Sequence, residues 1–175
     1  MKTSRATIQR SLIFALLAAA AVTIASLTIG REIYGSKEYT FLSFAIINLS
    51  GYLFFILMPV ELAFIYYLHT DLNMILLNLT AVGTALLSQG IDYYIGRSFS
   101  KQIIDRLIGR QRYEKAAMEI RKYGNIAIFF FNLLPLSSPV ILLAAGMLKH
   151  RLKEAFLYSL AGLLLKYLLM TLIFG

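Results

Sequence analysis

The sequence predicts an all-α integral membrane protein with three transmembrane helices, two opposed re-entrant helical hairpins and a cytoplasmic amphipathic helix. Of its 175 residues, 59% are hydrophobic and only 15% are charged, whereas a soluble domain carries about 25% charged residues. The mean hydropathy is +0.72, and uncharged stretches alternate with short charged clusters. This length suits one compact membrane domain without a separate soluble domain of ordinary size.

The net charge of +8 could suggest a nucleic-acid partner. However, the Lys and Arg residues lie between apolar stretches, where they contact anionic lipid headgroups and orient the chain. We therefore expect membrane lipids as partners and no nucleic acid. The absence of Cys excludes a disulfide framework and a thiolate metal site.

Residues 1–38 are predicted to form the first transmembrane helix and an outer loop. The uncharged stretch Ser11–Gly30 is long enough to span at about 20 residues per crossing. A cleaved signal peptide is the alternative, although its apolar core has only about 7–15 residues. Three basic residues precede the stretch and place the N-terminus in the cytoplasm: Lys2, Arg5 and Arg10.

Residues 39–175 are predicted to form the main membrane domain, which starts with a hairpin at 39–68 and a helix at 72–96. The loop at 97–123 should be cytoplasmic, because Arg97–Lys122 holds eight Lys/Arg against three Asp/Glu. The helix at 72–96 must then begin outside. The hairpin before it starts and ends outside, and is too short for two crossings.

The same reasoning predicts a second re-entrant hairpin at 124–148, entering from the cytoplasm. Its apolar segment Ala127–Met147 contains Pro135 and Pro139, and each proline removes a backbone donor and interrupts a helix. The final helix, 154–174, then places the C-terminus outside the plasma (inner) membrane. The alternative is a single crossing kinked by proline, which would place the basic cluster Lys149–Lys153 outside.

The two hairpins resemble each other in sequence. Phe54–Glu61 aligns with Phe130–Ser137, with both Phe, one Leu and the prolines Pro59 and Pro135 identical. With opposite entry sides, this similarity indicates an inverted repeat, whose interface near the midplane is the expected binding site.

The loop at 97–123 has apolar residues at helical spacing, so we expect an amphipathic helix in the headgroup plane, with a second short helix after it. Its candidate interfacial residues are Arg106, Arg110 and Arg112. Asp92 and Arg97 lie near the inner end of the helix at 72–96, and we expect them to be an interfacial pair or topology anchors.

Glu61 and Lys166 are opposite charges within apolar segments. A charge at membrane depth is costly and marks a functional site by default. Glu61 could instead be solvated near the outer headgroups, and Lys166 could snorkel. Because either charge alone would be uncompensated, we predict that the two side chains lie close together.

Asn132, Ser137 and Ser138 flank the proline bend and either line a polar cavity or satisfy carbonyls that the prolines leave free. His69 and His150 are isolated, and no phosphate-binding glycine loop or catalytic motif is found. We therefore expect no enzyme activity, no metal and no cofactor.

The stretch Ala81–Arg97, which ends in Tyr-x-Ile-Gly-Arg at Tyr93, Gly96 and Arg97, resembles the DedA superfamily of SNARE-associated, VTT-domain membrane proteins. Tyr123-Gly124-Asn125, Pro135 and Ala145-Gly146 follow in the same order. Gly162 and Lys166-Tyr167 resemble the ending of the compact YqaA-like branch.

The resemblance covers roughly residues 45–175 and implies opposed re-entrant hairpins and lipid transport between leaflets by a flippase or scramblase. The implied lipid is undecaprenyl phosphate in bacteria or a phospholipid in eukaryotic relatives, with proton coupling in some members. Glu61 matches the carboxylate of the first hairpin's Pro-x-Glu. A proton-coupled exporter or ion carrier is one alternative, and a non-transporting scaffold is another.

The sequence departs from the family's pattern at two places. The second hairpin of the family typically reads Arg-Phe-x-Pro-x-x-Arg, where this chain has Asn132 and Ser138. The Gly-Asp pair expected before Tyr93 is Ser88-Gln89, with an acid displaced to Asp92. Lys166 could replace only one of the missing arginine charges, as a point donor rather than a bidentate fork.

Overall fold

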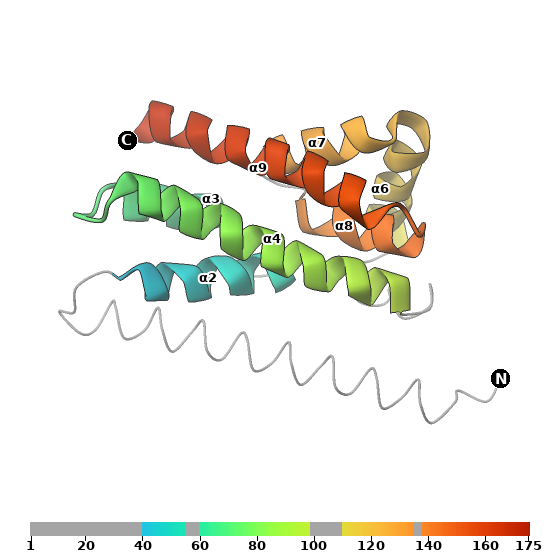
Figure 1. Cartoon of the computed structure of the whole chain (residues 1–175), viewed down its shortest axis with the longest axis horizontal. Coiled ribbons are helices and arrows are strands. Elements are labelled where there is room, and N and C mark those ends of the chain that lie inside the picture. Colours follow the sequence, from blue (N-terminus) through green and yellow to red (C-terminus); the bar gives the residue numbers. More distant parts are fainter. Residues whose placement is uncertain (1–39, 55–59, 99–109, 135–137) are drawn as a thin grey trace, which may run out of the picture.

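The computed structural model describes residues 40–54, 60–98, 110–134 and 138–175, and these residues are helical apart from short turns (Figure 1). The expectations for the first helix, for Pro59, Pro135 and Ser137, and for Arg106 concern residues outside these ranges. The helices are α2 (Phe41–Phe54), α3 (Val60–Leu68), α4 (Met74–Ser98), α6 (Arg110–Tyr123), α7 (Asn125–Leu133), α8 (Ser138–Met147) and α9 (Leu152–Phe174).

Two long helices, α4 and α9, form the axis of the bundle and run antiparallel (Figure 1). They have 25 and 23 residues and are the two described helices that are long and apolar enough to cross a membrane. Asn73 caps the start of α4, because its Oδ1 accepts hydrogen bonds from the amides of Ile75 and Leu76. α9 exposes several leucines that suit contact with lipid, among them Leu157, Leu164, Leu168 and Leu172.

Four short apolar helices surround the two long ones. They have 14, 9, 9 and 10 residues in α2, α3, α7 and α8, fewer than the roughly 20 that one crossing needs. α2 packs along α4, and α7 packs along α9 in the same way. The second helix of each short pair packs on the other long helix: α8 packs on α4, and α3 packs on α9. Each long helix therefore contacts both short pairs.

Glycines bring α4 and α8 into backbone contact. A Cβ at Gly96 would lie 2.0 Å from the carbonyl oxygen of Leu143, and a Cβ at Gly146 would lie 2.0 Å from that of Tyr93. No side chain fits in either place. Gly162 of α9 has a similar role, because its Cβ would meet the carbonyl oxygen of Phe129 at 2.5 Å.

α6 corresponds to the second short helix predicted in the basic loop, whereas the amphipathic helix predicted before it falls largely outside the described residues. α6 buries Tyr113, Ala116, Ala117 and Ile120 and packs on α7 and α8. Arg110 and Arg112 are exposed, and Arg110 Nε donates to Glu114 Oε1 at 2.8 Å. Arg110 and Arg112 lie in the first turn of α6.

The apolar core has two parts, one at each end of the bundle. The first lies among α2, α3, the start of α4 and the end of α9, around residues such as Phe44, Phe64 and Leu77. The second lies among α6, α7, α8, the end of α4 and the start of α9, around Ile128 and Leu142. Several buried polar side chains, described next, lie on the same helices.

Candidate functional site

Glu61 and Lys166 form a buried ion pair. Glu61 lies in the first turn of α3, and Lys166 lies in the second half of α9. Lys166 Nζ is 3.0 Å from Glu61 Oε1, and the two side chains are 2% and 11% exposed. The predicted closeness of these charges is confirmed, and the solvated position considered for Glu61 is not what the structure shows.

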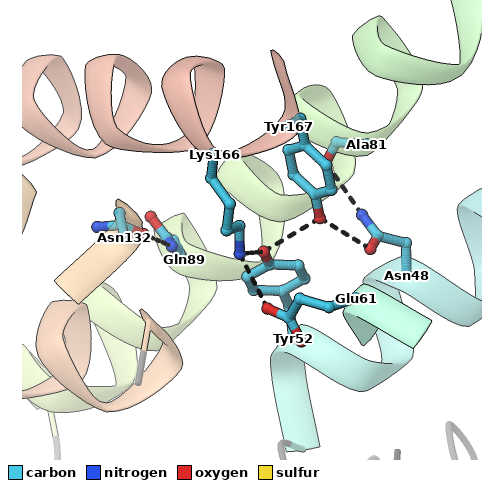
Figure 2. Close-up of polar contacts among 8 residues, drawn as sticks. All are labelled: Asn48, Tyr52, Glu61, Ala81, Gln89, Asn132, Lys166 and Tyr167. Carbon is cyan, nitrogen blue, oxygen red and sulfur yellow. Dashed lines mark hydrogen bonds and ion pairs between the residues drawn. The ribbon is translucent and has the colours of Figure 1, made fainter. Parts of the chain in front are cut away.

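Two tyrosines surround the ammonium group of Lys166 (Figure 2). Nζ donates a hydrogen bond to Tyr52 Oη at 2.6 Å and lies 5.1 Å from the ring centroids of both Tyr52 and Tyr167. For Tyr52 this distance follows from the hydrogen bond, because Nζ lies close to the ring plane beyond Oη. The Tyr167 ring has no such bond to Nζ, and a cation over its face is stabilised by the ring quadrupole. Phe64 packs against Tyr167 with a centroid distance of 4.7 Å and holds that ring in place.

The hydrogen bonds that lead from Lys166 to Asn48 all have the same donor-to-acceptor direction. Asn48 Nδ2 donates to the Ala81 carbonyl at 3.0 Å, so Asn48 Oδ1 faces Tyr167 and accepts from its hydroxyl at 3.2 Å. The Tyr167 oxygen then accepts from Tyr52, 3.1 Å away. Each hydroxyl hydrogen therefore points away from Lys166, and the oxygen that faces the ammonium group is an acceptor.

A second buried polar cluster lies toward the other end of α4. Gln89 Nε2 donates to Asn132 Oδ1 on α7. Asn132 Nδ2 donates to the Ile128 carbonyl at 2.9 Å and to Ser159 Oγ on α9 at 3.1 Å. Gln89, Asn132 and Ser159 are almost fully buried. Figure 2 shows the Gln89–Asn132 pair beside the Lys166 site.

The Gln89–Asn132 contact joins two of the departures from the DedA pattern. That pattern has an acid at the position of Gln89 and an arginine at the position of Asn132. This chain has two amides there, and they bond to each other. The pair is neutral and needs no counter-charge. It satisfies part of the polar capacity of both side chains and offers no cation for an anionic ligand.

Asp92 differs from its expected interfacial position. Its side chain is buried, with 4% exposure, and Oδ2 has no hydrogen-bond partner among the described residues. It does not pair with Arg97, whose Nη1 instead donates to Tyr93 Oη at 3.3 Å. The prediction was wrong because α8 covers this end of α4 through the Gly96–Gly146 crossing.

Tyr93, Gly96 and Arg97, the residues of the best family motif, have structural roles. Tyr93 Oη donates to the His150 carbonyl in the turn between α8 and α9, and Gly96 permits the close approach of α8. His150 Nε2 also contacts Asn125 Oδ1 at the start of α7. The motif therefore fixes the second short pair to α4.

No site role was predicted from the sequence for Asn48, Tyr52 or Tyr167, nor was the pairing of Gln89 with Asn132. One signal was present, because Asn48 is an amide within the apolar segment that became α2.

Of the other candidates, Ser138 and Pro139 lie in the first turn of α8. No group of three potential metal ligands occurs among the described residues.

The described residues are helical, with two membrane-length apolar helices and buried polar side chains among short helices, and these features are those of a membrane protein. The comparison with family models identifies the family to which this membrane protein belongs. The VTT domain matches residues 56–174, more than half of the chain, so the protein belongs to the VTT-domain family, which is the DedA or SNARE-associated family. No curated protein and no solved structure matches the chain. Assignment to the YqaA-like branch stays a prediction from Gly162, Lys166 and Tyr167.

Proposed function

We propose that this protein moves lipids with an anionic headgroup, such as a polyprenyl phosphate or a phospholipid, between the leaflets of the plasma membrane. Membership in the VTT-domain family supports a role in membrane transport. The observation that carries the more specific proposal is the buried Glu61–Lys166 pair. It puts a cation, already paired with an anion, inside otherwise apolar membrane segments.

In the proposed topology, α4 and α9 span the bilayer, and the pairs α2–α3 and α7–α8 are re-entrant hairpins that enter from opposite sides. The short helices support this arrangement, since none of the four reaches the length of a crossing. The equivalent packing of α2 on α4 and of α7 on α9 supports an inverted repeat. Both hairpins would end near the midplane, beside Lys166.

The cost of burying the pair is the reason to assign it a function. Replacing a buried ion pair by well-packed apolar residues is often neutral or stabilising, so stability alone does not account for its presence. Ionisable side chains within membrane segments mark substrate or ion pathways. Lys166 is a compact cation that can hold a phosphate oxygen.

Glu61 occupies the place that a headgroup anion would take. While the site is empty of lipid, its carboxylate neutralises Lys166 at 3.0 Å. An arriving phosphate, or protonation of Glu61, would release Lys166 from this pair, and the headgroup would become the new counter-ion. Tyr52 Oη and the Tyr167 ring remain with the ammonium group throughout. The exchange lowers the barrier for moving a charged headgroup through hydrocarbon.

Purified protein in liposomes with a dye-labelled anionic lipid tests this proposal. A membrane-impermeant reductant destroys the dye only in the outer leaflet, so transport appears as loss of the inner-leaflet dye. We expect transport by the native chain and strong loss of it in Lys166→Met and Glu61→Gln. Lys153→Met is the matched control, because Lys153 is an exposed lysine on the same helix and should retain transport.

Folded native protein that moves no dye-labelled anionic lipid would contradict the proposal. Movement of a zwitterionic lipid at the same rate, unaffected by Lys166→Met, would contradict the role of Lys166 in holding the headgroup. Uptake of a small solute or an ion without lipid movement would favour an exporter or ion carrier. No transport of either kind, with a cellular phenotype that survives loss of both charges, would favour a scaffold.

A further inference from the structure

Asp92 and Gln89 lie one helical turn apart on α4, and both carry a buried oxygen that lacks a partner among the described residues. The atoms are Asp92 Oδ2 and Gln89 Oε1. Residues three apart on a helix are neighbours on its surface, within reach of a hydrogen bond. Two buried acceptors on one turn of a helix are unfavourable unless they find a donor, and one donor within reach of both would serve.

The orientation of the Gln89 amide is fixed by its neighbours. The Ile128 carbonyl can only accept, so the atom of Asn132 that faces it is Nδ2. Asn132 Oδ1 therefore faces Gln89 and must accept from Nε2. This leaves Gln89 Oε1 as the atom that needs a donor, and rotating the amide would only break the bond to Asn132.

No described cation is placed to neutralise Asp92. The helices α2 and α8, which pack on α4, contain no Asp, Glu, Lys, Arg or His. On α3 and α9, Glu61 and Lys166 pair with each other, and Glu154 bonds to Arg151 and Asn125. On α4 itself, Arg97 bonds to Tyr93 Oη. A carboxyl group buried without a counter-charge takes up a proton rather than remain ionised.

We propose that Asp92 is a proton-binding site, and that its carboxyl group in the folded protein holds a proton at neutral pH and donates it to Gln89 Oε1. One proton supplies the missing donor for both orphaned oxygens. It also completes a directed chain from Asp92 through Gln89 and Asn132 to Ser159, which ties α4 to α7 and α9. The site is distinct from the Glu61–Lys166 pair, and its protonation does not depend on whether the protein transports lipid.

Infrared spectroscopy of the full-length protein at neutral pH tests the protonation directly. The native protein should show the carbonyl band of a protonated carboxylic acid, and Asp92→Asn should lack it. Asp71→Asn is the matched control, because Asp71 is exposed in the turn before α4, and its removal should leave the band unchanged. The band persisting in Asp92→Asn would overturn the proposal.

A second variant tests the partner without removing the acid. Gln89→Met deletes the acceptor, so the band of Asp92 should stay present but shift to the frequency of a more weakly bonded carboxyl group. An unshifted band would exclude donation to Gln89. This measurement also serves if Asp92→Asn fails to fold.

Melting temperatures provide an independent readout. The folded state would hold a proton that the unfolded state releases, so the stability of the native protein relative to Asp92→Asn should fall as the pH rises from mildly acidic to alkaline. Asp71→Asn should show no such trend against the native protein. Stabilisation by sodium or potassium that is lost in Asp92→Asn would identify a metal cation as the occupant and overturn the assignment of a proton.

Discussion

Lys166 and Glu61 lie 105 positions apart in the chain, yet their charged atoms are 3.0 Å apart in the interior of the bundle. The contact joins α9 to α3, the second helix of the pair α2–α3. Side chains supply this junction, whereas α4 and α8 meet through glycines with their backbones in contact. The contact of α3 with α9 and the contact of α8 with α4 are therefore made in different ways.

Removing one partner of the ion pair should cost more than removing both. Lys166→Met leaves the Glu61 carboxylate buried without a counter-charge, and Glu61→Gln leaves the ammonium group likewise. We expect each single change to lower the free energy of unfolding by about 3–5 kcal/mol. The double variant Glu61→Gln/Lys166→Met should be closer to the native protein. Thermal unfolding of the four proteins in one detergent measures this, and strictly additive losses would contradict a direct pairing.

Alanine at the glycine crossing should be severely destabilising. In Gly96→Ala and Gly146→Ala, the added Cβ would fall 2.0 Å from a backbone carbonyl oxygen, so α4 and α8 must move apart. We expect a loss of about 3 kcal/mol or failure to fold. Gly83→Ala is the control on α4, because a Cβ there meets nothing within 4 Å. It should stabilise the helix by about 0.5–1 kcal/mol.

Tyr52→Phe should weaken the support of Lys166 while keeping the ring. The change removes the oxygen that accepts from Nζ at 2.6 Å and the donor that faces Tyr167. Buried groups that lose a partner cost about 1–3 kcal/mol, so melting should fall accordingly. Tyr94→Phe removes an exposed hydroxyl and should change stability by less than about 0.5 kcal/mol. Equal melting of the two variants would show that the Tyr52 hydroxyl does not support Lys166.

The native chain contains no cysteine, so single cysteines report topology without background. We expect Asp71→Cys to react with an impermeant maleimide added to intact cells, because the turn before α4 should lie outside. Lys115→Cys and Lys153→Cys should react only after the membrane is opened, since they belong to basic segments. All three residues are exposed. Labelling of Lys153→Cys from outside would instead indicate a single crossing kinked by proline between α6 and α9.

The sequence predicted the helical class and the pairing of Glu61 with Lys166 because both depend on composition. Two opposite charges in a nearly uncharged interior have few other partners, so their closeness followed from the cost of burial. Tyr52, Tyr167 and Asn48 were missed because a tyrosine or an asparagine can sit in an apolar helix for many reasons. Only the fold brings together hydroxyls that lie 115 positions apart.

For Asp92, the sequence predicted a different environment from the one in the structure. A charged residue near a helix end is usually solvated, and the sequence predicted that position for Asp92. The actual burial depends on Gly96 and Gly146, which lie 50 positions apart and permit α8 to cover the end of α4. Periodicity along one helix contains no information about which neighbour will cover it.

The direction of the hydroxyl bonds around Lys166 has an energetic consequence. In water, an ammonium ion is stabilised by oxygen atoms that turn toward it, and leaving that shell is the main cost of entering a membrane. Here the oxygen of Tyr52 and the ring of Tyr167 already point at Nζ, and the bonds to Tyr167 and Asn48 keep them from turning away. The protein thus holds a partial substitute for a hydration shell, and in the proposed exchange of anions Lys166 would not have to be hydrated first.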